Sequence, residues 1–124
     1  MIEPELSKII VDVFYIVYNK LGFGFLESVY KNALAIEFRK RGIRFEREVL
    51  IEALYDGMVV GTFRADFIVE ERILLEIKST KCLTDADDRQ HLNYLRSSRV
   101  ELGYLLHFGP RPQFRRLIFT NDRK

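Results

Sequence analysis

Cysteine, histidine and tryptophan are scarce in this chain of 124 residues, which contains one cysteine, two histidines and no tryptophan. A lone cysteine, Cys82, excludes an intramolecular disulfide, and so few thiol and imidazole groups disfavour a structural zinc site. No apolar run approaches the ~18 residues that a membrane-spanning helix needs. The first residues, MIEPELSK, are too acidic and polar for a signal peptide. These absences predict a cytoplasmic protein with no membrane partner.

The chain also lacks an excess of charge of either sign. Its 20 basic and 18 acidic residues leave a formal net charge of +2, which does not by itself predict a polyanionic partner. Two segments are nevertheless basic, since 39–47 and 111–124 each hold five basic side chains and one acidic one. Either these segments contact phosphate groups or they are solvated surfaces, and charge alone favours the second interpretation.

What is present is an ordinary globular composition, with 48% hydrophobic and 31% charged residues. Internal repeats, low-complexity stretches and proline-rich linkers are missing. A chain of this length can bury one core without disulfides or metals. We therefore expect a single domain over residues 1–124.

Three segments have the apolar periodicity of helices. The first begins at Pro4 and ends before Gly22, and the second begins near Phe25 and ends before Gly42. A third helix is expected to end near Ser98. The acidic residues of its first turn, Asp85, Asp87 and Asp88, suit the positive end of a helix dipole.

Five segments are predicted to be strands: 47–55, 58–69, 73–79, 103–108 and 114–120. Asp56-Gly57 predicts a tight hairpin between the first two, because both central residues of the favoured turn need a positive φ. The element order is α-α-β-β-β-α-β-β. It predicts a fold between the α+β and α/β classes, with a mixed central sheet flanked by helices, in which the third helix connects two parallel strands.

The most informative residues are charged side chains inside the predicted strands. Glu76 and Lys78 point to the same face of their strand, and Asp66 interrupts the apolar preceding strand. If residues 70–72 form a three-residue loop, Val69 pairs with Ile73 and Asp66 lies opposite Glu76. A two-residue loop would instead place the two carboxylates on opposite faces.

Adjacent carboxylates repel each other unless a cation lies between them. Mg²⁺ and Mn²⁺ prefer such oxygen ligands, with water and substrate phosphate completing the coordination. Lys78 could then orient an attacking water or stabilise charge that develops on phosphorus. This set suits phosphodiester hydrolysis, and a salt-bridged cluster of Asp66, Glu76 and Lys78 without a ligand is the equally weighted alternative.

Two helices carry further candidates. Glu27 lies in the first turn of the second helix, where the helix dipole alone favours an acidic residue. Tyr30, one turn later, either packs in the core or reaches a phosphate. On the third helix Gln90 and Tyr94 share one face, which either touches substrate or faces solvent. His91 is expected at the surface.

These residues resemble the motifs of the GxxExxY family, a group within the PD-(D/E)xK nuclease superfamily. The matching segments are, in chain order, Gly24-Phe-Leu-Glu27-Ser-Val-Tyr30, Arg64-Ala-Asp66-Phe67, Glu76-Ile-Lys78, Gln90-His-Leu-Asn93-Tyr94-Leu95 and Gly103-Tyr-Leu-Leu-His-Phe-Gly109. The resemblance spans residues 5–120. Some superfamily members place a Gln-x-x-x-Tyr element near the active site, which implies such a place for Gln90 and Tyr94.

The resemblance implies a restriction-endonuclease-like α-β-β-β-α-β core with a Mg²⁺ or Mn²⁺ site at its centre. By this likeness Asp66 and Glu76 are metal ligands, Lys78 is the catalytic lysine and Glu27 is an additional ligand, direct or through water. Ala65 stands where the superfamily motif has proline. That proline is not a ligand, and every charged position of the motif is kept.

The prediction is therefore a divalent-metal-dependent nuclease that cleaves DNA. A domain this small has little surface for reading bases, so it would recognise shape or strand ends. Cleavage of both strands would need a homodimer or two successive nicks. One alternative is a non-catalytic module that binds nucleic acid or protein with structural carboxylates, and another is chemistry on a small phosphorylated molecule. A convergent, solvent-reachable site favours the enzyme, and a closed salt-bridge cluster favours the module.

Overall fold

A computed structural model describes residues 2–124. The elements, in chain order, are α1 (Pro4–Leu21), α2 (Glu27–Lys40), β1 (Phe45–Tyr55), β2 (Met58–Val69), β3 (Ile73–Lys78), α3 (Asp85–Ser97), β4 (Leu102–Phe108), β5 (Pro112–Ile118) and the 3-10 turn η1 (Asn121–Arg123). This order confirms the predicted α-α-β-β-β-α-β-β arrangement. No helix in the described part of the chain is both long and apolar enough to cross a membrane.

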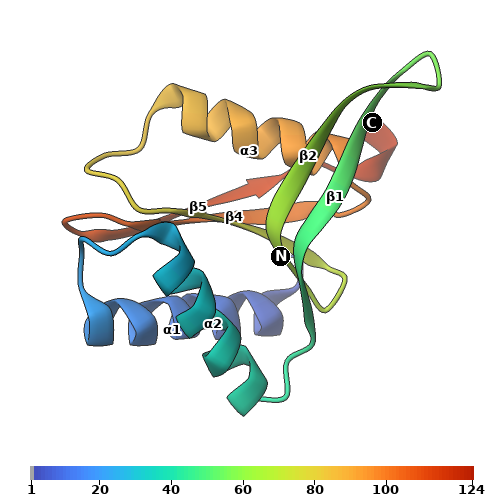
Figure 1. The fold of residues 1–124 in the computed structure, drawn as a ribbon. Coiled ribbons are helices and arrows are strands. Elements are labelled where there is room, and N and C mark those ends of the chain that lie inside the picture. Colours follow the sequence, from blue (N-terminus) through green and yellow to red (C-terminus); the bar gives the residue numbers. More distant parts are fainter. Residues whose placement is uncertain (1) are drawn as a thin grey trace.

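The strands form one mixed sheet in the order β1-β2-β3-β4-β5. β3 and β4 are parallel and are connected through α3, whereas the other neighbouring strands are antiparallel. Figure 1 shows α1 and α2 below the sheet and α3 above it. A parallel pair needs a long crossover connection, which α3 supplies.

Two cores lie on opposite faces of the sheet. Ile73, Leu75 and Ile77 of β3 pack into the core against α1 and α2. Leu74 belongs to the other core, where Leu95 of α3 covers it. Side chains alternate along a strand, so Glu76 and Lys78 share the α3 side of β3 with Leu74. The sheet thus presents two charged residues next to an apolar layer.

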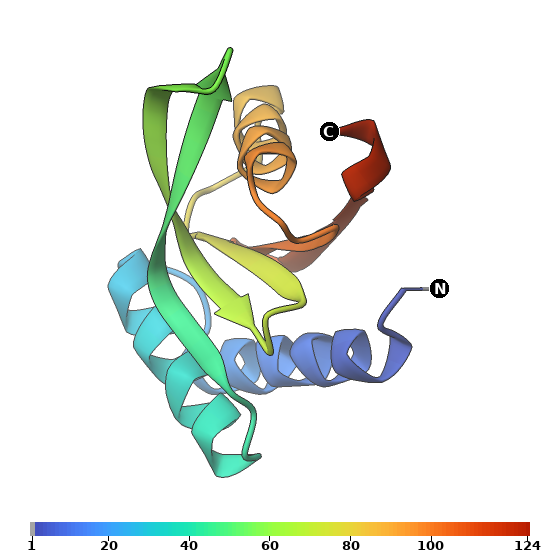
Figure 2. The same ribbon diagram turned by 90° about the vertical axis from the view of Figure 1, so that its right-hand side faces the viewer.

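The β1–β2 hairpin is long, twisted, and extends past α3 (Figure 2). Its turn residues Asp56 and Gly57 have φ values of 50° and 77°, as the Asp-Gly pair predicts. A further irregularity occurs at Glu48, whose φ is 52° and which lies across from Asp66 in the register. Positive φ is uncommon for glutamate, so the hairpin is distorted where it meets the charged residues.

Thr84 caps the third helix, α3, immediately before its predicted acidic first turn. The Thr84 side chain accepts a hydrogen bond from the Asp87 amide at 3.2 Å, and the Asp87 carboxylate accepts one from the Thr84 amide at 3.0 Å. This reciprocal capping satisfies two backbone donors that a helix N-terminus otherwise leaves free. It also fixes the start of the helix that carries Gln90 and Tyr94.

The prediction that His91 lies at the surface is wrong. His91 is 2% exposed on the inner side of α3, and its ring packs against the backbone of Gly103 in β4. Burial lowers the pKa of His91 to about 4, so the imidazole is neutral at physiological pH. The close approach is possible because residue 103 is glycine, whose missing Cβ leaves space for the ring.

Candidate active site

Asp66 and Glu76 lie side by side on neighbouring strands. Val69 pairs with Ile73, so the β2–β3 loop has three residues, and the register carries Asp66 opposite Glu76. One Asp66 oxygen, Oδ2, accepts a hydrogen bond from the Ile77 amide at 2.7 Å. Both residues are buried, since only 8% of the surface of Asp66 and 5% of that of Glu76 is exposed to solvent. Of the two loop lengths left open by the sequence, the structure has the one that brings the carboxylates together.

Glu76 is held in an environment that opposes its charge. Burial, and secondarily the neighbouring Asp66 carboxylate, raise the pKa of Glu76 to about 9. The Lys78 ammonium acts in the opposite direction and does not compensate. Glu76 Oε1 is buried and has no hydrogen-bond partner among residues 2–124. A buried oxygen without a donor is costly and therefore calls for a ligand or a proton.

Lys78 is linked to α3 through a chain of polar side chains. Its Nζ donates to Gln90 Oε1 at 3.0 Å, and Gln90 Nε2 donates to the Tyr94 hydroxyl at 3.1 Å. Burial, and next the charge of Glu76, raise the pKa of Tyr94, so its phenol stays protonated. The ring of Tyr94 stacks on Phe63 with centroids 4.7 Å apart. The face of α3 that carries Gln90 and Tyr94 therefore points toward the charged strand.

Lys31 is a member of this cluster that the sequence analysis missed. Its Nζ lies 2.9 Å from Asp66 Oδ1 and 3.3 Å from Glu48 Oε1. Burial would lower the pKa of Lys31, but hydrogen bonding and charge from Asp66 and Glu48 outweigh it and raise that pKa. Lys31 follows Glu27 by four residues and so lies on the same face of α2, which is the sequence feature that could have identified it.

Glu27 itself lies beside the cluster rather than within it. It occupies the first turn of α2 and lines a pocket of about 430 Å³ together with Ser79 and the exposed Phe23 and Phe25. Among residues 2–124, no three carboxylate, imidazole or thiol groups converge closely enough to hold a metal ion. The structure thus brings together five of the six predicted site residues, and the role of Glu27 as a further ligand stays a prediction.

Tyr30 is a core residue. Its ring is fully buried and stacks on Phe108 with centroids 4.0 Å apart. Its hydroxyl donates to the Gly22 carbonyl at 2.5 Å and accepts from the Phe25 amide at 3.3 Å. Of the two interpretations of Tyr30, the structure supports packing, and the residue fixes the loop that precedes Glu27.

The carboxylate pair fits a Mg²⁺ or Mn²⁺ ion. Mg²⁺ is commonly held through one or two protein carboxylates, with waters and substrate phosphate completing the shell. Asp66 and Glu76 supply hard oxygen donors, and Glu76 Oε1, which has no hydrogen-bond partner among residues 2–124, would become a ligand atom once the carboxyl group loses its proton. These two residues would hold the ion. The Lys31 ammonium currently provides the positive charge beside Asp66.

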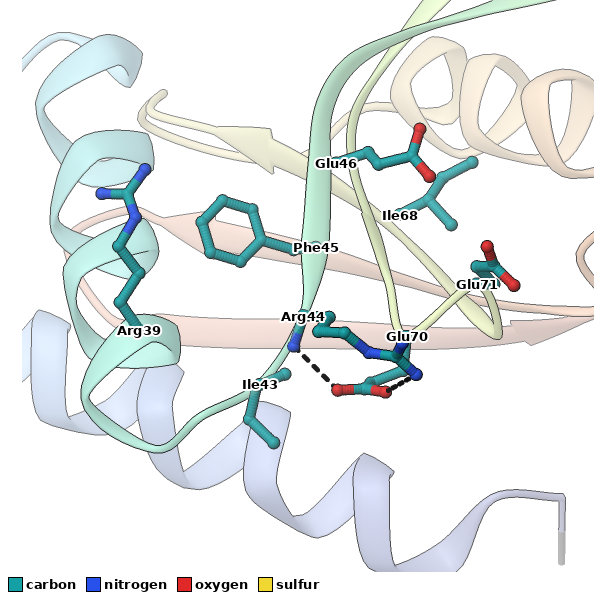
Figure 3. Close-up of a pocket in the computed structure, with 8 residues that line it drawn as sticks. All are labelled: Arg39, Ile43, Arg44, Phe45, Glu46, Ile68, Glu70 and Glu71. Carbon is teal, nitrogen blue, oxygen red and sulfur yellow. Dashed lines mark hydrogen bonds and ion pairs between the residues drawn. The ribbon is translucent and has the colours of Figure 1, made fainter.

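A second pocket, of about 520 Å³, lies away from the carboxylate pair. It is formed at the end of α2 and the start of β1, and its lining includes Arg39, Arg44, Glu46 and Glu70. Figure 3 shows Glu70 accepting hydrogen bonds from the Arg44 backbone and guanidinium, at 2.7 and 3.4 Å. Its charged groups thus partly satisfy one another, and it contains none of the predicted site residues.

The two basic segments make many contacts within the protein. In the first, Arg44 pairs with Glu70, and the Arg39 guanidinium lies over the Phe45 ring. In the second, Arg115 pairs with Asp88, and Lys124 donates to two backbone carbonyls. These contacts agree with the interpretation of both basic segments as ordinary solvated surface, which is the interpretation that charge alone favoured.

Comparison with known proteins identifies the superfamily of the chain and finds a similar fold. The family model described as the PD-(D/E)XK nuclease superfamily matches residues 4–117. A solved structure titled "Crystal structure of SSO0001" is similar in fold, with a TM-score of 0.55 and 22% sequence identity. The match covers 75% of this chain and only 50% of that one. None of the curated proteins matches the chain.

The chain belongs to the PD-(D/E)XK nuclease superfamily, since the family model covers nearly its whole length. Its helices and five-stranded mixed sheet are those of the restriction-endonuclease-like fold, which confirms the predicted fold class.

Proposed function

We propose that this protein is a Mg²⁺- or Mn²⁺-dependent nuclease that hydrolyses phosphodiester bonds in DNA. The observation that carries the proposal is the adjacency of Asp66 and Glu76, with Lys78 on the same strand face. A bound divalent ion would supply positive charge for the developing phosphorane and lower the pKa of water. The superfamily assignment supports the same chemistry.

The chain's own residues would position the reacting groups. Asp66 is oriented by the Ile77 amide, which holds one of its oxygens, while the other contacts the Lys31 ammonium. Lys78 would hold the attacking water or a phosphate oxygen, and Gln90 restrains its ammonium. Tyr94, as a protonated phenol, offers Gln90 its acceptor oxygen. This arrangement favours a lysine that is preorganised rather than free in solvent.

The loop before Glu27 favours substrates with unpaired bases. Phe23 and Phe25 are 45% and 47% exposed, and the Phe25 carbonyl accepts a hydrogen bond from Ser79, the residue that follows Lys78. Aromatic side chains stack on unpaired bases without sequence preference. We therefore expect single-stranded, branched or frayed DNA to bind more tightly than intact duplex.

A non-catalytic binding module is the second candidate, and one observation favours it. Lys31 already neutralises Asp66, and the side chains of this pair are 16% and 11% exposed. A closed cluster of this kind stabilises a fold without any ligand. In that case the protein would bind nucleic acid or protein and would not cleave it.

The test is cleavage of labelled linear, supercoiled, single-stranded and branched DNA and of RNA, each with Mg²⁺, Mn²⁺ or EDTA. Asp66→Asn and Lys78→Met should each reduce the rate by about 10²-fold or more, because the first removes a proposed metal ligand and the second removes the group proposed to hold the attacking water or a phosphate oxygen. Asp12→Asn is the matched control, since Asp12 is an exposed carboxylate paired with Lys8 on α1. Cleavage that needs no metal, or that survives in both site variants, would contradict the proposal. Binding without cleavage in any condition would support the module.

Three finer assignments belong to the same proposal. The Gly24, Glu27 and Tyr30 spacing supports membership in the GxxExxY group, and we place the protein in the cytoplasm. For cleavage of both strands we propose a homodimer, with contact through the hairpin tip, where Leu54 and Val60 are exposed. Sedimentation of the protein with and without a DNA duplex tests the dimer, and a monomer in both conditions would refute it.

A further inference from the structure

We propose that Lys31 is a built-in competitor for the metal ion, and that its ammonium must leave Asp66 before a divalent cation can bind there. The inference rests on the proposed metal site and adds a residue that controls how tightly the site binds its ion. It assigns a role to a lysine outside the motifs of the sequence.

The contacts of Lys31 identify it as the cation of the carboxylate cluster. Its Nζ lies 2.9 Å from Asp66 Oδ1, which is the Asp66 oxygen not used by the Ile77 amide. Oδ1 has no backbone hydrogen bond, so we assign it to the ion, and the ammonium already contacts this oxygen. The side chains of Lys31 and Asp66 are only 16% and 11% exposed, so solvent screens the pair weakly.

Two cations cannot share this oxygen at short range without strong repulsion. A divalent ion that binds Asp66 must therefore displace the ammonium, and its apparent affinity is lowered by the free energy of the ion pair it breaks. The measured dissociation constant contains only the free-energy difference between Lys31 paired with Asp66 and Lys31 displaced from it.

Glu48 provides a place for the displaced lysine. Glu48 Oε1 lies 3.3 Å from Lys31 Nζ, at the distorted position of β1 across from Asp66. The ammonium can shift toward Glu48 without leaving the neighbourhood of the site. Its positive charge then remains where a substrate phosphate would approach, so displacement from the carboxylate makes Lys31 available to the substrate.

The experiment measures Mn²⁺ binding to the full chain by calorimetry, with no nucleic acid present. The proteins are the wild type, Lys31→Gln, Lys31→Arg, Asp66→Asn and Lys8→Gln. Lys8→Gln is the matched control, because Lys8 also makes a 2.9 Å ion pair, with Asp12 on the exposed side of α1. A second readout is the NMR signal of the Lys31 ammonium, followed during a Mg²⁺ titration of the wild type.

We expect Lys31→Gln to bind Mn²⁺ at least about tenfold more tightly than the wild type, which corresponds to about 1.4 kcal/mol. Lys31→Arg keeps a competing charge, so neither it nor Lys8→Gln should bind more tightly than the wild type. Asp66→Asn should lose binding. The Lys31 ammonium signal should move toward that of a solvated lysine as Mg²⁺ is added.

Two results would overturn the inference, and only the second would also overturn the proposed metal site. If the wild type binds Mn²⁺, Asp66→Asn does not, and Lys31→Gln binds equally or more weakly, Lys31 is not a competitor and the metal site stands. If no protein binds Mn²⁺, or if Asp66→Asn binds as the wild type does, the proposed metal site fails together with the inference.

Discussion

Replacing Glu76 by glutamine is expected to change how the stability of the protein depends on pH. In the folded protein, burial and then Asp66 raise the pKa of Glu76 from its ordinary value of 4.5 to about 9. Between these values the folded state keeps a proton that the unfolded chain has lost. The free energy of unfolding therefore falls as pH rises through this window. Glutamine does not titrate, so the free energy of unfolding of Glu76→Gln should not fall in this way as pH rises.

The size of the effect follows from the length of the pH window. Each pH unit inside it changes the free energy of unfolding by up to ~1.36 kcal/mol, so about 4 kcal/mol is lost between pH 5 and pH 8. The assay is urea unfolding at pH 5, 6.5 and 8, in EDTA, for the wild type and Glu76→Gln. Glu52→Gln, a change at an exposed carboxylate of β1, is the control and should follow the wild type. The same pH slope in Glu76→Gln and in the wild type would refute the argument that Glu76 is held protonated.

Two further substitutions test the packing around the site. Gly103→Ala should destabilise the fold by about 1–3 kcal/mol, because a Cβ there would lie 2.5 Å from Nε2 of the buried His91 ring. In thermal unfolding, Gly61→Ala is its control, since a Cβ at that strand position meets no described atom within 4 Å, and equal melting temperatures for the two variants would contradict the prediction. Tyr30→Phe should cost about 1–2 kcal/mol through the lost hydrogen bond to the Gly22 carbonyl, and it should speed amide exchange in the loop that this hydroxyl holds. Unchanged stability and exchange in Tyr30→Phe would show that the hydroxyl does not fix the loop.

Much of the architecture could be predicted from the sequence because its causes are local. Apolar spacing, Pro4 and the Asp56-Gly57 turn act within a few residues, and the observed elements follow them closely. The adjacency of Asp66 and Glu76 depends on the length of the loop between their strands, so the sequence predicts it only if that loop has three residues.

The features that were missed depend on contacts between distant parts of the chain. Lys31 meets Asp66 although the two residues are far apart in sequence, and a lysine on an amphipathic helix ordinarily faces solvent. His91 was assigned to the surface because helical spacing identifies a shared face but not what covers it. Its burial requires Gly103 on another element, which periodicity in the helix cannot indicate.

The most direct test of the metal site is a crystal structure of the protein in Mn²⁺, with an anomalous difference map. We predict a peak between the carboxylates of Asp66 and Glu76, with the Lys31 ammonium moved from Asp66 toward Glu48. A map without a peak at these carboxylates, with Lys31 still 2.9 Å from Asp66, would contradict the assignment of this cluster as a metal-dependent active site.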